Sequence, residues 1–461
     1  MAGKTTENRG AWGGKIGFIL AASGSAVGLG NLWKFPYLAY ENGGGKDGQG
    51  AGTFVLLYLF AVLIVGFPVM LAEIMVGRRS RRNPVGAFKV LRPKSPWFLV
   101  GALGVITGFL LLSYYAVVAG WTGEYFIQAI TGKLAKSSPE EIKLSFGAFL
   151  DNPVKQVLWL VGFMGLSMAV VIGGVSKGIE RVTKFLMPIL LFMLLFLAFK
   201  AINLSGGSKA ITYLFKPDFS TITPKLVLDA LGQAFFSLSL GMGAIITYGS
   251  YLSRKDNIAV SGASIVVLDT MVGIVAAIII IATILSFDGV QMESGSVGNL
   301  FTAIPVIFKG IPGGNFMMIA FYTLVAFAAL TSTISLLEVV VSYFVDEKSW
   351  SRKRAVLLTG GAITLLGIPS ALSFNLLKGA TVNGKSFFDI MDYLCANWFL
   401  PVGGLAIALF AGWILTREEK LDELKNNLRL YRFWNICVRF IAPLAIAAVL
   451  LGIIFNLGGQ G

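Results

Sequence analysis

The sequence of 461 residues contains no histidine and only two cysteines, Cys395 and Cys437, both within apolar runs. The lack of imidazole excludes histidine metal ligands, histidine-based catalytic triads and histidine proton relays. Two cysteines in such runs exclude a disulfide framework and a cysteine-rich metal site. Charged residues are also scarce, at 13% of the chain. These absences exclude histidine- and cysteine-based active sites, and we predict that the protein is not an enzyme.

Apolar residues, by contrast, make up 56% of the chain, and the mean hydropathy is +0.76. A soluble domain of this length could not bury so much apolar surface. Apolar runs recur throughout, and each is long enough to cross about 30 Å of hydrocarbon. We predict an all-α polytopic membrane protein with 11 transmembrane helices, near residues 12–37, 51–77, 97–131, 156–174, 180–202, 227–253, 258–287, 299–345, 354–374, 387–415 and 432–457.

The arginines indicate the orientation of these spans in a chain whose net charge is +14. If the N-terminus is cytoplasmic, every arginine except Arg439, near the start of the last span, falls in a cytoplasmic segment. The outer segments then hold lysines only. This is the distribution that the positive-inside rule describes. The net positive charge is thus explained by basic residues in the cytoplasmic segments, and it does not indicate a nucleic-acid site. An odd number of spans places the C-terminus outside.

Two of the expected spans are interrupted by glycine. Residues 23–37, SGSAVGLGNLWKFPY, place Gly28, Gly30 and Asn31 within the first span, and residues 236–243, FSLSLGMG, interrupt the sixth. Close helix packing through small residues would explain either segment alone. The two segments occupy corresponding positions in two runs of five spans, an arrangement that indicates a transporter binding site. Unwound backbone leaves N–H and C=O groups free, and lipid tolerates this only where something polar binds them.

Several polar side chains lie inside apolar spans. Asp269, in the seventh span, is a functional candidate because a carboxylate is costly in hydrocarbon, although it could instead be a structural partner of a polar neighbour. Thr331, Ser332 and Thr333 follow one another in the eighth span, where hydroxyls often bond back to the preceding turn. Glu73, at the inner end of the second span, is expected to bond the unpaired backbone of a broken helix.

A phosphate-loop pattern also occurs in the chain. Residues 379–386, GATVNGKS, match the pattern G-x-x-x-x-G-K-S. That motif binds nucleotide when a strand precedes it and a helix follows it. Here it lies in a short outer loop between the ninth and tenth spans, where ATP is absent. We therefore expect no nucleotide as a ligand, and no nucleic acid as a partner.

The segments GSAVGLGNLWKFPY, ENGGG, GQAFFSLSLGMGAIITYGSY and AALTST closely resemble the neurotransmitter:sodium symporter family. The resemblance extends from Arg9 to about Asp392 and is greatest to the bacterial multi-hydrophobic amino-acid transporters. It implies one transporter domain over residues 1–461 with a LeuT-type 5+5 inverted repeat, in which helices 1 and 6 are broken. The repeats are expected at 12–202 and 227–415, followed by the eleventh helix at 432–457. The expected location is a bacterial inner (plasma) membrane.

The resemblance also implies two Na⁺ sites and a substrate site. The first Na⁺ site would consist of the substrate carboxylate with Ala26, Asn31, Ser237 and Asp269. The second would consist of Gly24, Val27, Ala328, Thr331 and Ser332. The residues implied in binding the substrate are Ser25, Ala26, Leu29, Gly30, Leu111, Tyr115, Phe236, Ser237, Ser239, Met242, Ser332 and Leu336.

A gate is implied on each side of the substrate site. The outer gate would be formed by Lys34 and Asp392, above a lid of Tyr115 and Phe236. The inner gate would be formed by Arg9, Asp346 and Trp12. Gly178 and Pro188 resemble a motif that lets the inner end of the fifth span unwind, which would admit water to the second Na⁺ site.

The sequence departs from the family pattern at three positions. Lys34 stands where many relatives have arginine, so the outer gate holds a point charge instead of a bidentate fork. Position 269 is Asp where many relatives have Asn, and position 273 is Gly where chloride-dependent members have Ser. A fixed negative charge at Asp269 can replace chloride beside the first Na⁺, so we predict chloride-independent transport. We also hypothesise that Asp269 takes up a proton once Na⁺ leaves, which would give proton antiport.

The leading interpretation is sodium-coupled symport of hydrophobic and aromatic L-amino acids by alternating access. Met242 favours it, because a flexible thioether adapts to side chains of different shape, and Leu111 and Leu336 complete an apolar pocket. Substrate and Na⁺ should bind cooperatively, because the substrate carboxylate is itself a ligand of the first ion. The alternatives are a proton-coupled amino-acid exchanger on the same fold and a cation channel. The sequence shows no ring-forming filter motif for the latter.

Overall fold

The computed structural model describes residues 10–45, 48, 50–287, 297–309 and 313–455. Within these ranges nine helical stretches are long and apolar enough to cross a membrane, and the bent pair Lys15–Ala26 and Gly30–Asn42 makes a tenth. The nine are Gly52–Ser80, Phe98–Ile130, Pro153–Ile172, Val175–Ile202, Ile258–Ser286, Gly314–Lys348, Arg352–Leu372, Phe387–Ile414 and Leu428–Ile454. The chain is therefore an all-helical, multi-pass membrane protein, as the sequence predicts.

Several spans are assembled from α-helices joined by short π-helical turns, which carry η labels as the short 3₁₀ helices do. In chain order the helices are α1 (Lys15–Ala26), η1 (Gly30–Lys34), α2 (Phe35–Asn42), α3 (Gly52–Ala61), η2 (Val62–Gly66), α4 (Phe67–Ser80), α5 (Pro84–Leu91), α6 (Phe98–Ile130), α7 (Lys133–Lys136), α8 (Pro139–Leu150), α9 (Pro153–Ile172), η3 (Val175–Glu180), α10 (Arg181–Ile202), α11 (Gly207–Phe215), η4 (Phe219–Thr221), α12 (Pro224–Ser237), α13 (Ala244–Gly249), α14 (Ile258–Ser286), η5 (Val297–Leu300), α15 (Ala303–Lys309), α16 (Gly314–Lys348), α17 (Arg352–Leu372), α18 (Phe387–Tyr393), η6 (Leu394–Phe399), α19 (Leu400–Leu409), η7 (Phe410–Ile414), α20 (Arg417–Glu423), α21 (Leu428–Ile436), η8 (Cys437–Ile441) and α22 (Ala442–Ile454).

The first span is broken at the predicted place. α1 ends at Ala26, and Val27 adopts an extended conformation with φ −68° and ψ 91°. The chain resumes as a helix at Gly30, and the two halves are bent by 56°. The break separates the last carbonyls of α1 from the first amides of η1, so both sets of backbone groups are free to bind a ligand.

The sixth span is broken as well. α12 and α13 are separated by residues 238–243, in which Ser239, Gly241 and Gly243 have φ values of 55°, 85° and 77°. Such left-handed conformations favour glycine. Space is also restricted, because a Cβ on Gly241 would lie 2.2 Å from the Leu400 carbonyl oxygen. Each half is too short to cross a membrane alone, so α12 and α13 together correspond to the predicted span at 227–253.

The eighth span is shorter than the sequence suggests. The expected run at 299–345 divides into η5, α15 and a separate long helix, α16, which begins at Gly314. Gly313 precedes α16 with φ 79°, a conformation that ends any helix extending from the N-terminal side. Hydropathy does not detect this division, because α15 is itself apolar. The membrane-crossing helix is therefore α16 alone.

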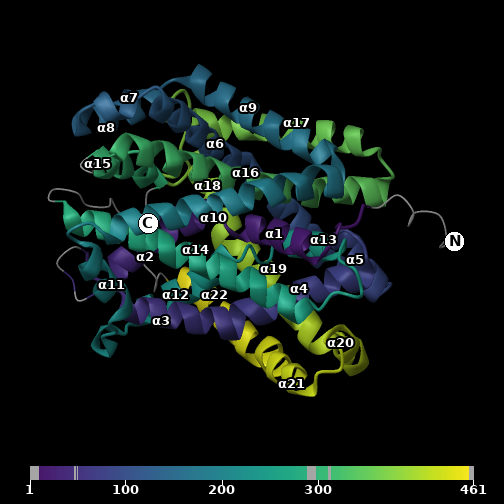
Figure 1. Cartoon of the computed structure of the whole chain (residues 1–461). Coiled ribbons are helices and arrows are strands. Elements are labelled where there is room, and N and C mark those ends of the chain that lie inside the picture. The colour runs from purple at the N-terminus through teal and green to yellow at the C-terminus, as the bar shows by residue number, and fades with distance from the viewer. Residues whose placement is uncertain (1–9, 46–47, 49, 288–296, 310–312, 456–461) are drawn as a thin grey trace.

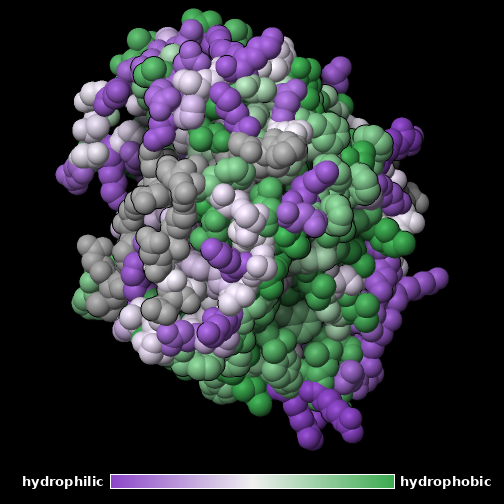
Figure 2. All heavy atoms as spheres, turned by 60° about the vertical axis from the view of Figure 1, so that its left-hand side comes forward, coloured by the Kyte–Doolittle hydropathy of each residue, from purple (hydrophilic) through white to green (hydrophobic). Residues whose placement is uncertain are grey.

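α16 is the central helix of the bundle, since 89% of its most apolar window is buried. It packs along α6, and the other long helices lie around these two (Figure 1). The start of α1, α5 and α20 lie toward one end of the molecule, and α2, α8 and α11 toward the other. In Figure 2 a broad hydrophobic surface lies between hydrophilic residues on its left and right, as expected for a belt in contact with lipid.

Ion pairs at the α5–α20 end connect the second span to the segment that precedes the last one. Arg78 of α4 pairs with Glu423 of α20 at 2.6 Å, and both side chains are only 3% exposed. Arg92, just after α5, pairs with Glu419 at 2.7 Å. These contacts place α20 against the arginine-rich ends of α4 and α5, on the side that the sequence predicts to be cytoplasmic.

Candidate functional site

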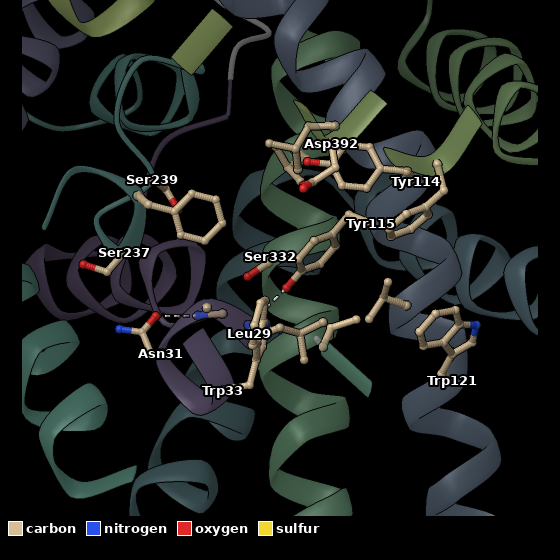
Figure 3. Close-up of a pocket in the computed structure, with 18 of the residues that line it drawn as sticks. Leu29, Asn31, Trp33, Tyr114, Tyr115, Trp121, Ser237, Ser239, Ser332 and Asp392 are labelled. Atoms are coloured by element: carbon tan, nitrogen blue, oxygen red, sulfur yellow. Dashed lines mark hydrogen bonds between the residues drawn. The ribbon is translucent and has the colours of Figure 1, made fainter. Parts of the chain in front are cut away.

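One cavity of about 440 Å³ lies between the two broken spans and the helices α6 and α16. Figure 3 shows Asn31 from the first span on the same side as Ser237 and Ser239 from the sixth, and Leu29 beside Ser332 and Tyr115. Its wall includes every residue that the sequence implicates in substrate binding: Ser25, Ala26, Leu29, Gly30, Leu111, Tyr115, Phe236, Ser237, Ser239, Met242, Ser332 and Leu336.

Backbone groups of the first break face this cavity. The Leu29 amide donates a hydrogen bond to the Tyr115 hydroxyl over 3.3 Å, and the Gly28 amide donates one to Asn31 Oδ1 over 3.3 Å (Figure 3). A Cβ on Gly30 would lie 2.7 Å from the Phe236 ring. Only glycine fits there without displacing that ring. Amides at the start of a helix, next to a phenolic hydroxyl, form an arrangement that suits a carboxylate.

A buried polar cluster joins the first and seventh spans. Asn31 Nδ2 donates to Asp269 Oδ1 over 2.9 Å and to the Asp269 carbonyl over 3.2 Å. The Asp269 side chain is 0% exposed, yet its second carboxylate oxygen has no hydrogen-bond partner. A buried carboxylate oxygen without a donor is energetically costly unless a cation or a proton is bound. This cluster therefore fits a Na⁺ ion, which accepts oxygen ligands of this kind.

The hydroxyl run of α16 packs against α1. A Cβ on Gly24 would lie 3.1 Å from Thr331 Cβ, so these two residues are in contact across the helices. The Thr331 hydroxyl donates to the carbonyls of Phe327 and Ala328 at 3.1 and 3.0 Å, whereas the Ser332 hydroxyl is buried without a partner. The sequence-based concern that such hydroxyls bond back to the helix is thus confirmed for Thr331.

Glu73 supports the break in the sixth span. Its carboxylate Oε1 accepts a hydrogen bond from the Gly241 amide over 2.7 Å, and the side chain is fully buried. The predicted role of Glu73, bonding the unpaired backbone of a broken helix, is confirmed. Ser239 also holds the break, because its hydroxyl donates to the Ser25 carbonyl over 2.9 Å. The two breaks are therefore connected to each other and to α4.

The predicted outer gate is not paired in this structure. The Lys34 ammonium lies over the Phe236 ring, 4.4 Å from its centroid, and forms no ion pair with Asp392. Figure 3 shows Asp392 beside Tyr114 and Tyr115 instead. The cavity continues past Trp121 toward α8 and α18, at the end opposite to the start of α1. The substrate site is thus reached from the side that the sequence predicts to be external.

The inner end of the site is closed by Trp12. Its indole Nε1 donates to the Tyr248 carbonyl over 2.9 Å, and its ring packs against Phe18, Tyr248 and Tyr251. Asp346 accepts a hydrogen bond from the Asn83 amide over 2.8 Å. Arg9, the expected partner of Asp346, lies outside the described residues.

The fifth span is helical throughout in this structure. Gly178 lies in η3, and Pro188 lies inside α10, which follows without a gap. A Cβ on Gly178 would lie 2.1 Å from the Val170 carbonyl oxygen, so this helix approaches α9 closely. The conformation described here therefore has the segment wound, with Trp12 closing the inner end.

Sequence reasoning missed two polar neighbours of the site. The hydroxyls of Tyr58 and Ser237 lie 3.3 Å apart, and Ser25 donates to the Ser335 hydroxyl over 2.8 Å. Tyr58 lies in an otherwise apolar run, and no neighbouring residue in the sequence indicates that its hydroxyl contacts the site. Ser335 could have been found, because it follows Ser332 by about one helical turn and so shares its face.

Comparisons with known proteins agree with this geometry. The crystal structure of MhsT in complex with L-phenylalanine is 43% identical to this chain, covers 96% of it and 99% of MhsT, and has a TM-score of 0.88. The sodium-dependent transporter YhdH of Bacillus subtilis is 38% identical over 96% of this chain and 97% of its own length. A sodium-dependent transporter of Haemophilus influenzae is 33% identical over 98% of this chain and 100% of its own length.

The family model of the sodium:neurotransmitter symporters matches residues 9–143 and 140–460. This covers nearly the whole chain, including both breaks and the cluster of Asn31 and Asp269. The resemblance noted in the sequence and the LeuT-type fold expected from it are confirmed. The chain belongs to the sodium:neurotransmitter symporter family and is a sodium-dependent membrane transporter, not an enzyme.

Proposed function

We propose that this transporter carries hydrophobic and aromatic L-amino acids into the cell together with Na⁺, by alternating access. The observation that carries the proposal is a buried carboxylate oxygen of Asp269 that has no hydrogen-bond partner, while the other carboxylate oxygen is bound by Asn31, which lines the cavity. MhsT, 43% identical to this chain, was solved with L-phenylalanine bound. An amino acid of similar size is compatible with the cavity volume of about 440 Å³.

The cavity has two chemically different ends. The backbone at Leu29 and Gly30 and the Tyr115 hydroxyl suit the carboxylate of the substrate. Leu111, Met242 and Leu336 line the apolar part, and none of them is charged. An amino acid would then lie with its charged groups at the breaks and its side chain against α6 and α16. A basic or acidic side chain would lack a counter-charge there.

We assign two Na⁺ ions to the ligand sets expected from the sequence. The first would be held by Ala26, Asn31, Ser237, Asp269 and the substrate carboxylate. The second would be held by Gly24, Val27, Ala328, Thr331 and Ser332. The partnerless oxygens of Asp269 and Ser332 support these assignments. Chloride is not required in this proposal, because Asp269 supplies the negative charge beside the first ion.

Coupling follows from the shared ligand. Since the substrate carboxylate completes the first Na⁺ site, substrate and Na⁺ each bind weakly without the other.

Lys34 and Asp392 would pair above the loaded site, and the inner end would open when Trp12 leaves Tyr248. Unwinding between Gly178 and Pro188 would then admit water to the second ion.

The domain and membrane assignments belong to the same proposal. Residues 12–202 and 227–415 would form the two inverted repeats, with 432–457 as the eleventh helix. We place the protein in a plasma (inner) membrane with the N-terminus in the cytoplasm and the C-terminus outside. The pairing of Arg78 and Arg92 with α20, at the arginine-rich end, supports this orientation.

The test is uptake of radiolabelled leucine and tryptophan into proteoliposomes, with an inward Na⁺ gradient or with K⁺ in place of Na⁺. Uptake that occurs only with Na⁺, and that concentrates the amino acid, supports the proposal. Equal uptake in both media overturns it and favours the proton-coupled exchanger. That second candidate rests on the same oxygen of Asp269, which a proton could also satisfy. Uptake that never exceeds equilibration would indicate a channel.

A further inference from the structure

Arg439 is the exception to the predicted distribution of arginines, because it lies outside the cytoplasmic segments and near the start of the last span. It lies in η8, which belongs to the apolar stretch Leu428–Ile454. Its guanidinium stacks on the ring of Trp413, 4.4 Å from the centroid, and the Trp413 indole donates to the Arg439 carbonyl over 3.1 Å. Trp413 is 51% exposed. The pair therefore lies at the outer surface of the bundle, where η7 meets η8.

The charge of Arg439 is not balanced within the described part of the chain. Its Nε is buried without a hydrogen-bond partner, and no carboxylate described here pairs with its guanidinium. Other partly buried arginines differ in this respect: Arg78 pairs with Glu423, Arg92 with Glu419 and Arg352 with Glu338. An arginine at membrane depth requires an anion or water, and the phosphate of a lipid is the anion that a membrane supplies.

A second cation lies close to Arg439. Lys420 of α20 donates from Nζ to the Gly412 carbonyl over 2.5 Å and to Asn435 Oδ1 over 3.2 Å. Its pKa is lowered to about 8, first by burial and then by the positive charge of Arg439. The nearest acid on α20, Glu419, is already bound by Arg92. The junction of η7, η8 and α20 is therefore positively charged, with Lys420 buried and Trp413 exposed.

The surface around Arg439 and Trp413 is apolar and faces outward. Ile436 and Phe440 are 54% and 49% exposed and lie on the same face of the last span. Arg432, one turn before Ile436, is exposed toward the end that holds α20. Deeper in the membrane than Arg439, Phe440 and Leu444 are 49% and 71% exposed. The order from Arg432 through Arg439 to these apolar side chains follows the profile of a lipid from headgroup to acyl chain.

We propose that the surface pair of Arg439 and Trp413, beside the buried positive charge of Lys420, binds an anionic phospholipid of the inner leaflet, with its phosphate on the Arg439 guanidinium. The headgroup lies toward Arg432, and the acyl chains lie along Phe440 and Leu444, which follow Arg439 deeper into the membrane. The proposal rests on the orientation assigned above, in which α20 is cytoplasmic, but it does not depend on the transported substrate. The clustered positive charge favours a phosphatidylglycerol-type lipid over a zwitterionic one.

Native mass spectrometry of the purified transporter tests this directly. Phosphatidylglycerol or phosphatidylethanolamine is added to the detergent-solubilised protein, and the bound lipid is counted during collisional release. We expect the wild type to retain phosphatidylglycerol in preference, and Arg439→Gln to bind it about fivefold more weakly. Arg429→Gln is the matched control, since Arg429 is exposed in α21, ten residues before Arg439 in the same span, and it should bind as the wild type does.

Three results would overturn the proposal. Equal retention by Arg439→Gln and the wild type would show that the guanidinium does not hold the lipid. Loss of retention with millimolar inorganic phosphate would identify a free-anion site. A change of oligomeric state in Arg439→Gln would identify a carboxylate of a second copy as the partner. If Arg439→Gln fails to fold, Arg439→Lys keeps the charge and loses the stacking, and should still prefer the anionic lipid.

Discussion

Asn31 donates a hydrogen bond to one carboxylate oxygen of Asp269 over 2.9 Å, while the other oxygen of Asp269 has no partner in a fully buried site. The two residues come from the first and seventh spans. Asn31 thus fixes the orientation of the carboxylate and leaves its second oxygen for an ion. The dependence of transport on Na⁺ and chloride should therefore change when either residue is replaced.

Replacing Asp269 with asparagine keeps the shape of the side chain and removes its charge. We expect Na⁺-dependent uptake to fall about ten- to hundredfold, the range for losing a charged ligand interaction. Added chloride should restore part of it, because an external anion can then take the place of the carboxylate. Uptake with chloride and with gluconate measures this, and Asp218→Asn, in an exposed turn, is the control. For the wild type, a twofold loss of uptake without chloride would contradict the assigned role of Asp269.

Gly30→Ala should weaken substrate binding by about tenfold, because its Cβ would lie 2.7 Å from the Phe236 ring and overpacking of this kind costs about 1–3 kcal/mol. Equilibrium binding of labelled leucine in the presence of Na⁺ is the measurement. Gly165→Ala is the control, since nothing lies within 4 Å of that position. Unchanged leucine affinity in Gly30→Ala would remove this glycine from the substrate site.

Met242→Phe should change the preference among substrates. A rigid ring in place of the thioether leaves less room for a large side chain, so tryptophan uptake should fall about tenfold relative to leucine uptake. Leucine measured in the same variant is the internal control for folding. A tryptophan-to-leucine ratio equal to that of the wild type would move the apolar pocket away from Met242.

The contact of α20 with α5 should depend on pH. Burial opposes the ionisation of Glu419, but hydrogen bonds from Arg92 and the Thr416 amide, with the charges of Arg92 and Arg79, lower its pKa from 4.5 to about 2. A lowered pKa in the folded state stabilises the protein above pH 4.5, and this contribution is lost as the pH falls toward 2. Melting curves in detergent should show that loss for the wild type.

Arg92→Gln is the matched variant for this effect. It removes the partner of Glu419, so its melting temperature should be lower near pH 6 and should converge with that of the wild type at low pH. A constant difference between the two proteins from pH 6 to pH 2.5 would contradict the assignment to Glu419.

Much of the site could be predicted because its residues are exceptions to the rules of a lipid-embedded helix. Gly28, Gly30 and Asp269 stand out in apolar runs, and the structure places them at the break and in the buried cluster. Tyr58 could not be found in this way, because an aromatic residue in an apolar span is common and its hydroxyl matters only through its neighbour Ser237. The separation of α15 from α16 was missed because hydropathy does not report where the backbone turns.

The position of Lys34 could not be derived from sequence either. Whether Lys34 stacks on Phe236 or pairs with Asp392 depends on how far the outer path is open, and the same sequence is compatible with both arrangements. Sequence patterns indicate which side chains can come into contact, but the conformational state of the transporter determines which of these contacts form.

The contact between Glu73 and Gly241 has a consequence for how the two breaks move. α13 lies against α4 almost backbone to backbone, since a Cβ on Gly77 would lie 2.0 Å from the Ile246 carbonyl oxygen. The sixth break is thus anchored to the second span at two levels, whereas the start of α1 is held mainly by the indole of Trp12 and by Glu180, which accepts from the Gly13 amide. We therefore expect the sixth break to stay fixed against the second span, whereas the start of α1 can move away once the contacts of Trp12 and Glu180 are lost.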